Sequence, residues 1–187
     1  MKRGNIYDRN LKSRKEVSQS AFLFLFSEMV QYCINKSSGN PLELEKQLEE
    51  LGYTIGPKIL ELVTYRERSS RKATNVLDIL RFIHDPVWQT LFNKKADELE
   101  QNTDEEDEFM INEKEPSLCN MFAKVPRGQS DYVNCAAFVA GIIEGLLNAA
   151  CFNARVTAHF VGTGDGKKTV FLVKFASEII EREKLRR

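Results

Sequence analysis

The pattern of apolar and polar residues predicts that the first half of the chain is helical. A polar, basic stretch at residues 1–17 is expected to be a mobile arm, and Ser18 or Ser20 is expected to cap a helix that runs to about Cys33. A second helix is predicted at 41–51, ending at Gly52, and a third from Thr54 to a basic loop at 66–72, with Pro57 in its first turn. A fourth is predicted from Thr74 to about His84, where Pro86 ends it, and a fifth from Val87 to about Gln101.

The second half changes to short alternating segments that are typical of strands. An acidic linker at 101–108 precedes them, and a long apolar helix at 135–150, with Asn134 as its expected cap, interrupts them. A hairpin turn is predicted at 162–166 and a terminal amphipathic helix at 177–187. The predicted strands are 108–112, 118–123, 154–161 and 169–175. This order of elements predicts an α+β fold for a single domain at 18–187.

The first predicted helix is unusual because its start, from Ala21 to Phe26, is apolar on every side. A surface helix normally has one apolar stripe and a polar opposite face. Two explanations stay open from the residues alone. Either the helix is covered on both sides by its own chain, or one side is covered by another polypeptide, because large exposed apolar patches mark interfaces.

The helix at 135–150 carries small residues at every fourth position, and they share one face. These residues are Ala137, Gly141, Gly145 and Ala149. Because the face has almost no side-chain bulk, another backbone can approach it closely. The pattern predicts a central core helix under the sheet, and a ligand channel beside the small-residue face is the alternative.

The composition argues against several classes of function. The 27 basic and 27 acidic residues cancel, whereas a nucleic-acid-binding protein has a basic excess or stripe. Four cysteines without a C-x-x-C pair and two histidines are too few for a zinc site, and they indicate a reducing compartment. The N-terminal stretch lacks the apolar segment of a secretory signal.

The sequence contains no convincing set of catalytic residues. A Cys135–His159 pair would need an orienting acid, and His159 has no acidic neighbour in the sequence. The glycine-rich 162–166 is followed by a strand, whereas a phosphate-binding loop leads into a helix. We therefore expect no catalytic residue, no cofactor and no metal site, and a role in packing against other proteins.

Several segments carry the pattern of a known family. Two long ones are Gly52–Glu61 and Asn134–Gly145, and Phe152 and Val156–His159 follow at the matching distance. In these segments the chain resembles the small α+β subunits of the transport protein particle, TRAPP. Two further strings, at 87–92 and 95–100, resemble subunit five of that particle, and the resemblance covers about residues 17–187.

The resemblance implies several α-helices packed on one side of a twisted four-stranded antiparallel sheet. It also implies that subunits pair through their first helices. In this chain the residues expected at that interface are Phe22, Leu23, Phe24, Phe26, Met29, Val30 and Ile34. An acylated relative carries a palmitoyl-cysteine in the loop before its fourth helix. The corresponding stretch here, Arg66–Lys72, has no cysteine, so thioester acylation at this position is excluded.

The function implied by the resemblance is that of a structural subunit in a vesicle-tethering complex. That complex acts as the nucleotide exchange factor for a Rab-type GTPase in ER-to-Golgi transport. The expected neighbours are the acylated subunit three and the sedlin-like subunit two, and the GTPase is bound through the whole complex.

The expected location is cytoplasmic, at the periphery of cis-Golgi and endoplasmic reticulum membranes. Residues 1–17 are expected to form a solvated tail, with contact to anionic lipid as the alternative. A stand-alone domain that binds a small molecule or an acyl chain stays open as the alternative function.

Overall fold

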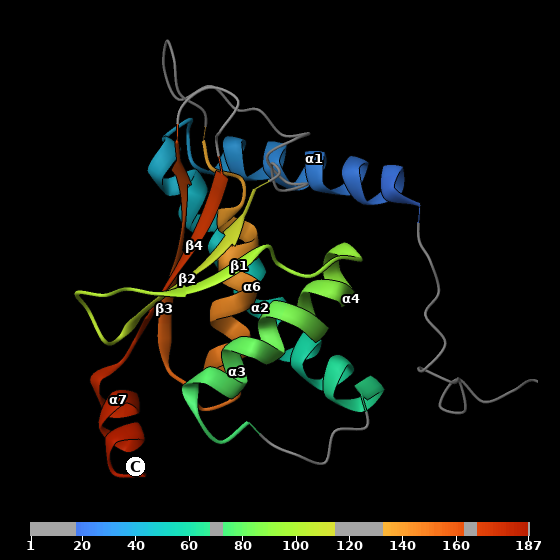
Figure 1. Cartoon of the computed structure of the whole chain (residues 1–187). Helices are drawn as coiled ribbons and strands as arrows, with labels where there is room; N and C mark the ends of the chain where they lie inside the picture. The colour runs from blue at the N-terminus through green and yellow to red at the C-terminus, as the bar shows by residue number, and fades with distance from the viewer. Residues whose placement is uncertain (1–17, 68–72, 115–132, 163–167, 187) are drawn as a thin grey trace, which may run out of the picture.

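The computed structural model describes residues 18–67, 73–114, 133–162 and 168–186. Within them, helices pack against a four-stranded antiparallel sheet with strand order β1-β2-β4-β3, which confirms the predicted fold class (Figure 1). The helices are α1 (Gln19–Lys36), α2 (Pro41–Glu67), α3 (Val76–Phe82), the π-helix η2 (Ile83–Val87), α4 (Trp88–Phe92), α6 (Ala137–Ala149) and α7 (Ser177–Lys184). The strands are β1 (Glu98–Gln101), β2 (Glu108–Glu113), β3 (Ala154–Val161) and β4 (Lys168–Phe175).

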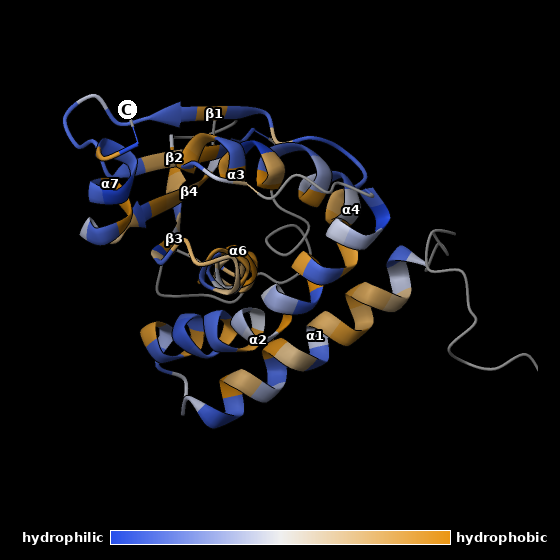
Figure 2. Ribbon diagram, turned by 90° about the horizontal axis from the view of Figure 1, so that it is seen from below, coloured by the Kyte–Doolittle hydropathy of each residue, from blue (hydrophilic) through white to orange (hydrophobic). Residues whose placement is uncertain are grey.

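The helix α6 occupies the centre of the molecule. Figure 2 shows it between the sheet and the pair formed by α1 and α2. Ten of its 13 residues are buried, so its uniformly apolar sequence matches its surroundings. Trp88 of α4 packs edge-on against Phe171 of β4, with ring centroids 5.4 Å apart, and this contact joins the α3–η2–α4 segment to the same core.

The edge strand β3 has half of its free edge covered by α6. The backbone N–H of Ala154 donates to Asn148 Oδ1 at 3.1 Å, and that of Val156 donates to Glu144 Oε2 at 2.8 Å. These two α6 side chains lie one helical turn apart and therefore match N–H groups that alternate along the strand. The contact satisfies backbone donors that an edge strand otherwise leaves unpaired.

The prediction of two separate helices at 41–51 and from Thr54 was wrong, because α2 is one helix of 27 residues. Gly52 does not end it, since the glycine is buried where α2 crosses α6. The Thr54 hydroxyl donates to the Leu51 carbonyl at 2.8 Å inside the helix and so does not cap a new one. Pro57 lies within α2, where its missing N–H leaves the carbonyl of Tyr53 without its usual helical donor.

The predicted break at Pro86 was also wrong. The chain stays helical from Val76 to Phe92, and Pro86 lies inside the π-helix η2. The wider turn accommodates a residue that has no backbone N–H. The helical segment ends at Asn93, whose φ of 57° places it in the left-handed conformation that closes many helices.

Residues 98–101 form the strand β1 and not the end of a predicted helix. Their Glu-Leu-Glu-Gln sequence has a high helix propensity, but pairing with β2 overrides it, with Leu99 opposite Ile111. The predicted acidic linker at 101–108 is therefore the connection of the β1–β2 hairpin, where the Asn102 N–H donates to the Glu108 carbonyl at 3.0 Å. The arm at 1–17, the predicted strand at 118–123 and most of the predicted turn at 162–166 lie outside the described residues.

In the part of the chain that the structure describes, none of the helices combines the length and the apolar character that crossing a bilayer requires.

Candidate protein-interaction site

One face of α1 attaches the helix to the rest of the chain. Phe26, Val30 and Cys33 are spaced one helical turn apart and are buried. The ring of Phe26 lies 5.5 Å from that of Phe138 on α6, so this face reaches the central helix as well as α2.

The opposite face of α1 exposes large apolar side chains to solvent. Phe24 is 76% exposed, Leu25 60% and Tyr32 61%. We call these three residues the outer α1 surface. Phe22 lies one turn before Phe26, stacks on its ring with centroids 5.9 Å apart, and is 37% exposed. Glu28 and Lys36 are the only charged residues in the 18-residue helix, so solvation of this surface is poor. Exposed apolar patches of this kind are typical of surfaces that another molecule covers.

The interface residues predicted from the sequence divide between the two faces. Phe26 and Val30 are buried in the core of this chain and are not available to a partner. Met29 and Ile34 are partly buried against the same core, and Leu23 is half-buried. Phe24 lies on the outer α1 surface, whereas Phe22 stacks on Phe26 and is only partly exposed.

Leu25 and Tyr32 also lie on the outer α1 surface, but sequence reasoning did not include them. Their outward position could have been inferred from the stripe of Phe26, Val30 and Cys33, which share one face at helical spacing and are buried. Leu25 precedes Phe26 by one position, about 100° around the helix, and Tyr32 precedes Cys33 in the same way. Both therefore turn toward the outer side.

The small-residue face of α6 is in contact with α2. A Cβ atom added at Gly141 would lie 2.0 Å from the Glu49 carbonyl oxygen, and one at Gly145 would lie 2.2 Å from the Tyr53 oxygen. The contact is reciprocal, because a Cβ atom at Gly52 would lie 2.0 Å from the Phe138 oxygen.

This arrangement brings Cα–H groups against carbonyl oxygens, including the Tyr53 carbonyl that Pro57 leaves without a helical donor. Ala137, at the start of α6, is buried, whereas Ala149, at its end, is exposed. The α2 backbone fills the space directly over the glycines, but a hollow beside the crossing is lined by Gly141, Glu49 and Glu144, so the ligand channel considered as an alternative stays a prediction.

An ion-pair cluster joins α2, α6 and β3 beside this crossing. Arg155 of β3 pairs with Glu49 of α2 and, at 3.2 Å, with Glu144 of α6. Burial raises the pKa of Glu49; Arg155 opposes this shift, and the neighbouring carboxylates of Glu144 and Glu45 add to it. Two carboxylates share one guanidinium, which fits a structural clamp between three elements.

The residues considered for nucleophilic catalysis are not arranged for it. Cys135 is fully buried in the turn before α6, and burial raises the pKa of its thiol to about 12. A nucleophilic cysteine needs the opposite shift. His159 is exposed on β3 and shares a hydrogen bond of 2.7 Å with Thr157. Among the described residues, no group of three or more His, Cys, Asp or Glu side chains is placed to hold a metal ion.

The fold is that of an α+β domain with one helix exposing an apolar surface, and comparison with known proteins places the chain in a family. Residues 22–176 match the family described as transport protein particle (TRAPP) component, and the chain belongs to this family. The resemblance to subunit five is also confirmed. A relative from Dictyostelium discoideum named trafficking protein particle complex subunit 5 is 51% identical over 95% of this chain and 96% of its own length.

The human protein of the same name is 41% identical over 92% of this chain and 88% of its own length. Among solved structures, the subunit 3 of the complex from Naegleria fowleri, described as covalently bound to palmitic acid, has a similar fold. Its TM-score is 0.68, with 18% identity, over 84% of this chain and 94% of that one.

Proposed function

We propose that this chain is a non-catalytic structural subunit of the TRAPP complex and that the outer α1 surface packs against a neighbouring subunit. The observation that carries the proposal is the exposure of Phe24 and Leu25 on a helix whose other face is anchored in the core. Burial of one such side chain is worth about 1.5–3 kcal/mol, which an isolated chain forgoes and an assembly recovers.

The family supports the choice of partner. The relatives at 41–51% identity are named as subunit 5 of the trafficking protein particle complex, and they match this chain over nearly its whole length. We propose the acylated subunit three as the neighbour at α1 and the sedlin-like subunit two as a second neighbour. Nucleotide exchange on a Rab-type GTPase in ER-to-Golgi transport then belongs to the whole complex, which acts as a tether at the periphery of Golgi and endoplasmic reticulum membranes.

The α1 interface is tested by placing a charge on the outer α1 surface. The double variant Phe24→Asp and Leu25→Asp is co-expressed with subunit three, and the complex is measured by co-purification and size-exclusion chromatography. We expect the variant to lose the complex, because two buried carboxylates without partners cost more than the apolar contact gains.

The control is Tyr65→Asp, which introduces one of these charges at an aromatic residue that is 53% exposed near the C-terminal end of α2. It should leave the complex intact. Unchanged co-purification of the double variant would rule out α1 as the interface.

A further inference from the structure

The second half of β3, residues 157–161, has an outer edge that α6 does not cover. The coverage reaches Val156, whose N–H donates to Glu144. Because the direction of the N–H groups repeats at every second residue of a strand, those of Ala158 and Phe160 point to the same side, away from β4. None of the described residues accepts a hydrogen bond from either group. We call residues 157–161 the free half of β3.

The sequence of α6 explains why the coverage stops there. Asn148 and Glu144, which accept from β3, are four residues apart on one face of the helix. The next two positions of this row are Ala140 and then Ala136, just before the helix, and a methyl group cannot accept a hydrogen bond. The free half of β3 therefore follows from which side chains α6 presents to it.

The free half of β3 also lacks the residues that usually protect a sheet edge from pairing with another chain. Such edges are normally short or carry charged residues or proline. The opposite edge strand, β1, has Glu98 and Glu100 in a strand of four residues. The sequence from 157 to 161 contains no acidic residue, lysine, arginine or proline, and Phe160 and Val161 are 44% and 46% exposed. An edge of this kind favours the addition of an extended strand.

A hollow of about 670 Å³ lies between β3 and α2, and we call it the α2–β3 hollow. Gly141 of α6 is part of its lining, and Gly141 is next to Ala140, which continues the row of α6 residues toward Ala158. The hollow therefore reaches the level of the free half of β3. Its lining carries four carboxylates against two cations, namely Glu45, Glu49, Glu50 and Glu144 against Lys46 and Arg155.

The excess of negative charge in the α2–β3 hollow is not cancelled by Arg155. Burial raises the pKa of Glu49, and the carboxylates of Glu144 and Glu45 add to this shift against the effect of the guanidinium. Glu50 is exposed at the rim of the hollow. A positively charged side chain is therefore the group that the hollow favours.

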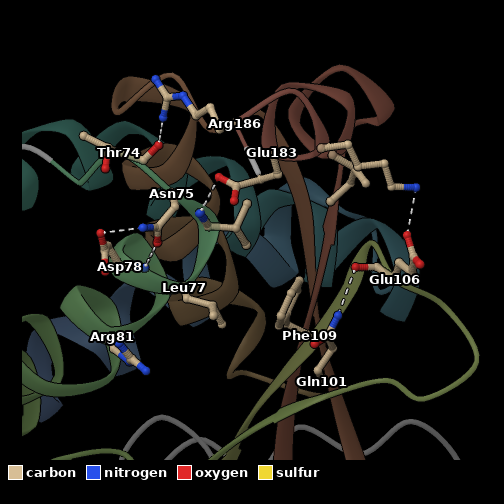
Figure 3. Close-up of a pocket in the computed structure, with 13 residues that line it drawn as sticks. Thr74, Asn75, Leu77, Asp78, Arg81, Gln101, Glu106, Phe109, Glu183 and Arg186 are labelled. Atoms are coloured by element: carbon tan, nitrogen blue, oxygen red, sulfur yellow. Dashed lines mark hydrogen bonds and ion pairs between the residues drawn. The ribbon is translucent and has the colours of Figure 1, made fainter.

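A larger hollow, of about 850 Å³, lies between α3, α7 and the β1–β2 hairpin, and it differs in this respect. There Glu183 Oε1 accepts a hydrogen bond of 2.9 Å from the backbone N–H of Val76. Arg186 donates to the backbone carbonyl of Thr74 (Figure 3). These backbone groups are already paired within the chain, whereas those of the free half of β3 are open to an incoming peptide.

We propose that the free half of β3 and the α2–β3 hollow bind an extended, basic segment of a partner protein as an added strand. The segment pairs its backbone with the N–H and carbonyl groups of Ala158 and Phe160. Phe160 shares the helix side of the strand with the buried Val156. Side chains of the added strand alternate in the same way, so a Lys or Arg that enters the hollow and an apolar residue beside Phe160 should be two positions apart. The unpaired edge selects the extended backbone, and charge complementarity selects the basic residue.

Cross-linking and hydrogen–deuterium exchange test the location. The full-length chain carries benzoylphenylalanine at position 160, the assembled complex is isolated from cells, and the cross-linked peptide is identified by mass spectrometry. We expect a segment of another protein with Lys or Arg two positions from an apolar residue. In the unsubstituted complex the amides of Ala158 and Phe160 should exchange more slowly than in the isolated chain. Capture of an acidic segment, of a second copy or of this chain itself, no capture, or unchanged exchange of both amides would overturn the proposal.

Two variants test the backbone and the charge separately. Ala158→Pro removes the N–H at the free edge and leaves the pairing with β4, because this N–H does not point to β4. Glu50→Lys reverses a charge of the α2–β3 hollow at an exposed position of α2. Each should weaken binding of the captured segment, prepared as a synthetic peptide, about tenfold or more in fluorescence anisotropy.

The matched controls are Ala158→Ser, which keeps the N–H, and Glu61→Lys, which makes the same reversal on α2 outside the hollow. Both should bind like the unchanged chain. Full affinity of Glu50→Lys would overturn the proposal, and so would full affinity of Ala158→Pro with a native circular dichroism spectrum. The proposal needs a protein partner but not the α1 interface, so loss of the complex in the double variant of Phe24 and Leu25 leaves peptide binding at β3 unchanged.

Discussion

The helices α6 and α1 both contain long apolar stretches but have very different surroundings. Ten of 13 residues are buried in α6, whereas only three of 18 are buried in α1. The difference comes from the number of elements that contact each helix. The sheet covers one side of α6 and α2 covers the other, while α1 is held along one face only (Figure 2). An apolar sequence therefore does not show whether a helix is covered by its own chain. Whether a helix is buried depends on how many other elements pack against it.

The largest loss of stability is expected from replacing Gly141 of α6, which lies against the α2 backbone. Gly141→Ala places a methyl group 2.0 Å from the backbone oxygen of Glu49, and a backbone has no rotamer with which to yield. We expect a cost beyond the roughly 1–3 kcal/mol of ordinary overpacking, large enough to prevent folding. Expression level, circular dichroism and urea unfolding measure it.

The matched control is Gly39→Ala in the turn before α2, where no atom lies within 4 Å of the added methyl group and φ is +78°. Its cost is the left-handed strain of about 1–2 kcal/mol. Equal stability loss in the two variants would mean that α2 and α6 do not cross as closely as described.

The next largest effect on the free energy of unfolding is expected from a comparison of the two faces of α1. Phe26→Ala empties a site in the core beside Phe138 and should lower the free energy of unfolding by about 3–5 kcal/mol. Phe24→Ala should change it by less than about 0.5 kcal/mol in the isolated chain, because Phe24 is 76% exposed. Chemical denaturation of the isolated protein distinguishes the two, and a large effect of Phe24→Ala would show that the chain itself covers the outer α1 surface.

The clamp at Arg155 should contribute less, and its contribution should depend on pH. Arg155→Ala leaves Glu49 and Glu144 close together without their shared cation. Since the guanidinium is partly screened by solvent, we expect a loss of about 1–2 kcal/mol at pH 7. The conservative control Arg155→Lys should keep part of this stability.

The sign of the pH dependence follows from Glu49. Its pKa in the folded protein is above the ordinary value of 4.5, so the folded state binds more protons in the window above that value, and stability falls as the pH rises through it. Loss of Arg155 raises this pKa further. Urea unfolding at pH 7 and pH 4 should therefore show a larger cost of Arg155→Ala at pH 7, and a larger cost at pH 4 would contradict the clamp.

The smallest expected difference between α1 and the region of α6 is in the rate of thiol labelling. Of the three cysteines that the structure describes, the exposed Cys151 should react first with iodoacetamide, while burial raises the thiol pKa of Cys33 on α1 and of Cys135 beside α6. Cys33 should react before Cys135, because α1 can detach by local opening of a single face. Peptide mapping over a time course measures the order, and equal rates at the two buried sites would remove the proposed difference in local stability.

The sequence was most informative where structure depends on neighbours along the chain. The alternation from Ala154 to Val161 predicted β3 with the bounds that the structure has. The strand β1 was missed because Leu99 becomes part of a strand only through Ile111, which lies on the other side of the hairpin. Local propensity favours a helix at 98–101, and no local signal opposes it.

The continuity of α2 also depends on a distant element. Gly52 and Pro57 are typical helix ends, yet here Gly52 faces the α6 backbone and the Tyr53 carbonyl, left without a donor by Pro57, lies against Gly145. Two segments with glycines four residues apart, 52–56 and 141–145, could have indicated a close helix crossing. The burial of Phe26 could not be predicted in the same way, because it depends on the position of Phe138 on α6 in the folded protein.

The unbroken α2 has a mechanical consequence. Its 27 residues span about 40 Å, from the turn after α1 toward the end of the fold that carries α3. A helix of this length, packed along its middle against α6, resists bending and keeps its two ends at a fixed distance. It would set the spacing between any two proteins held at the ends of this chain, so that substitutions which bend α2 near Pro57 would change the geometry of an assembly without touching either contact.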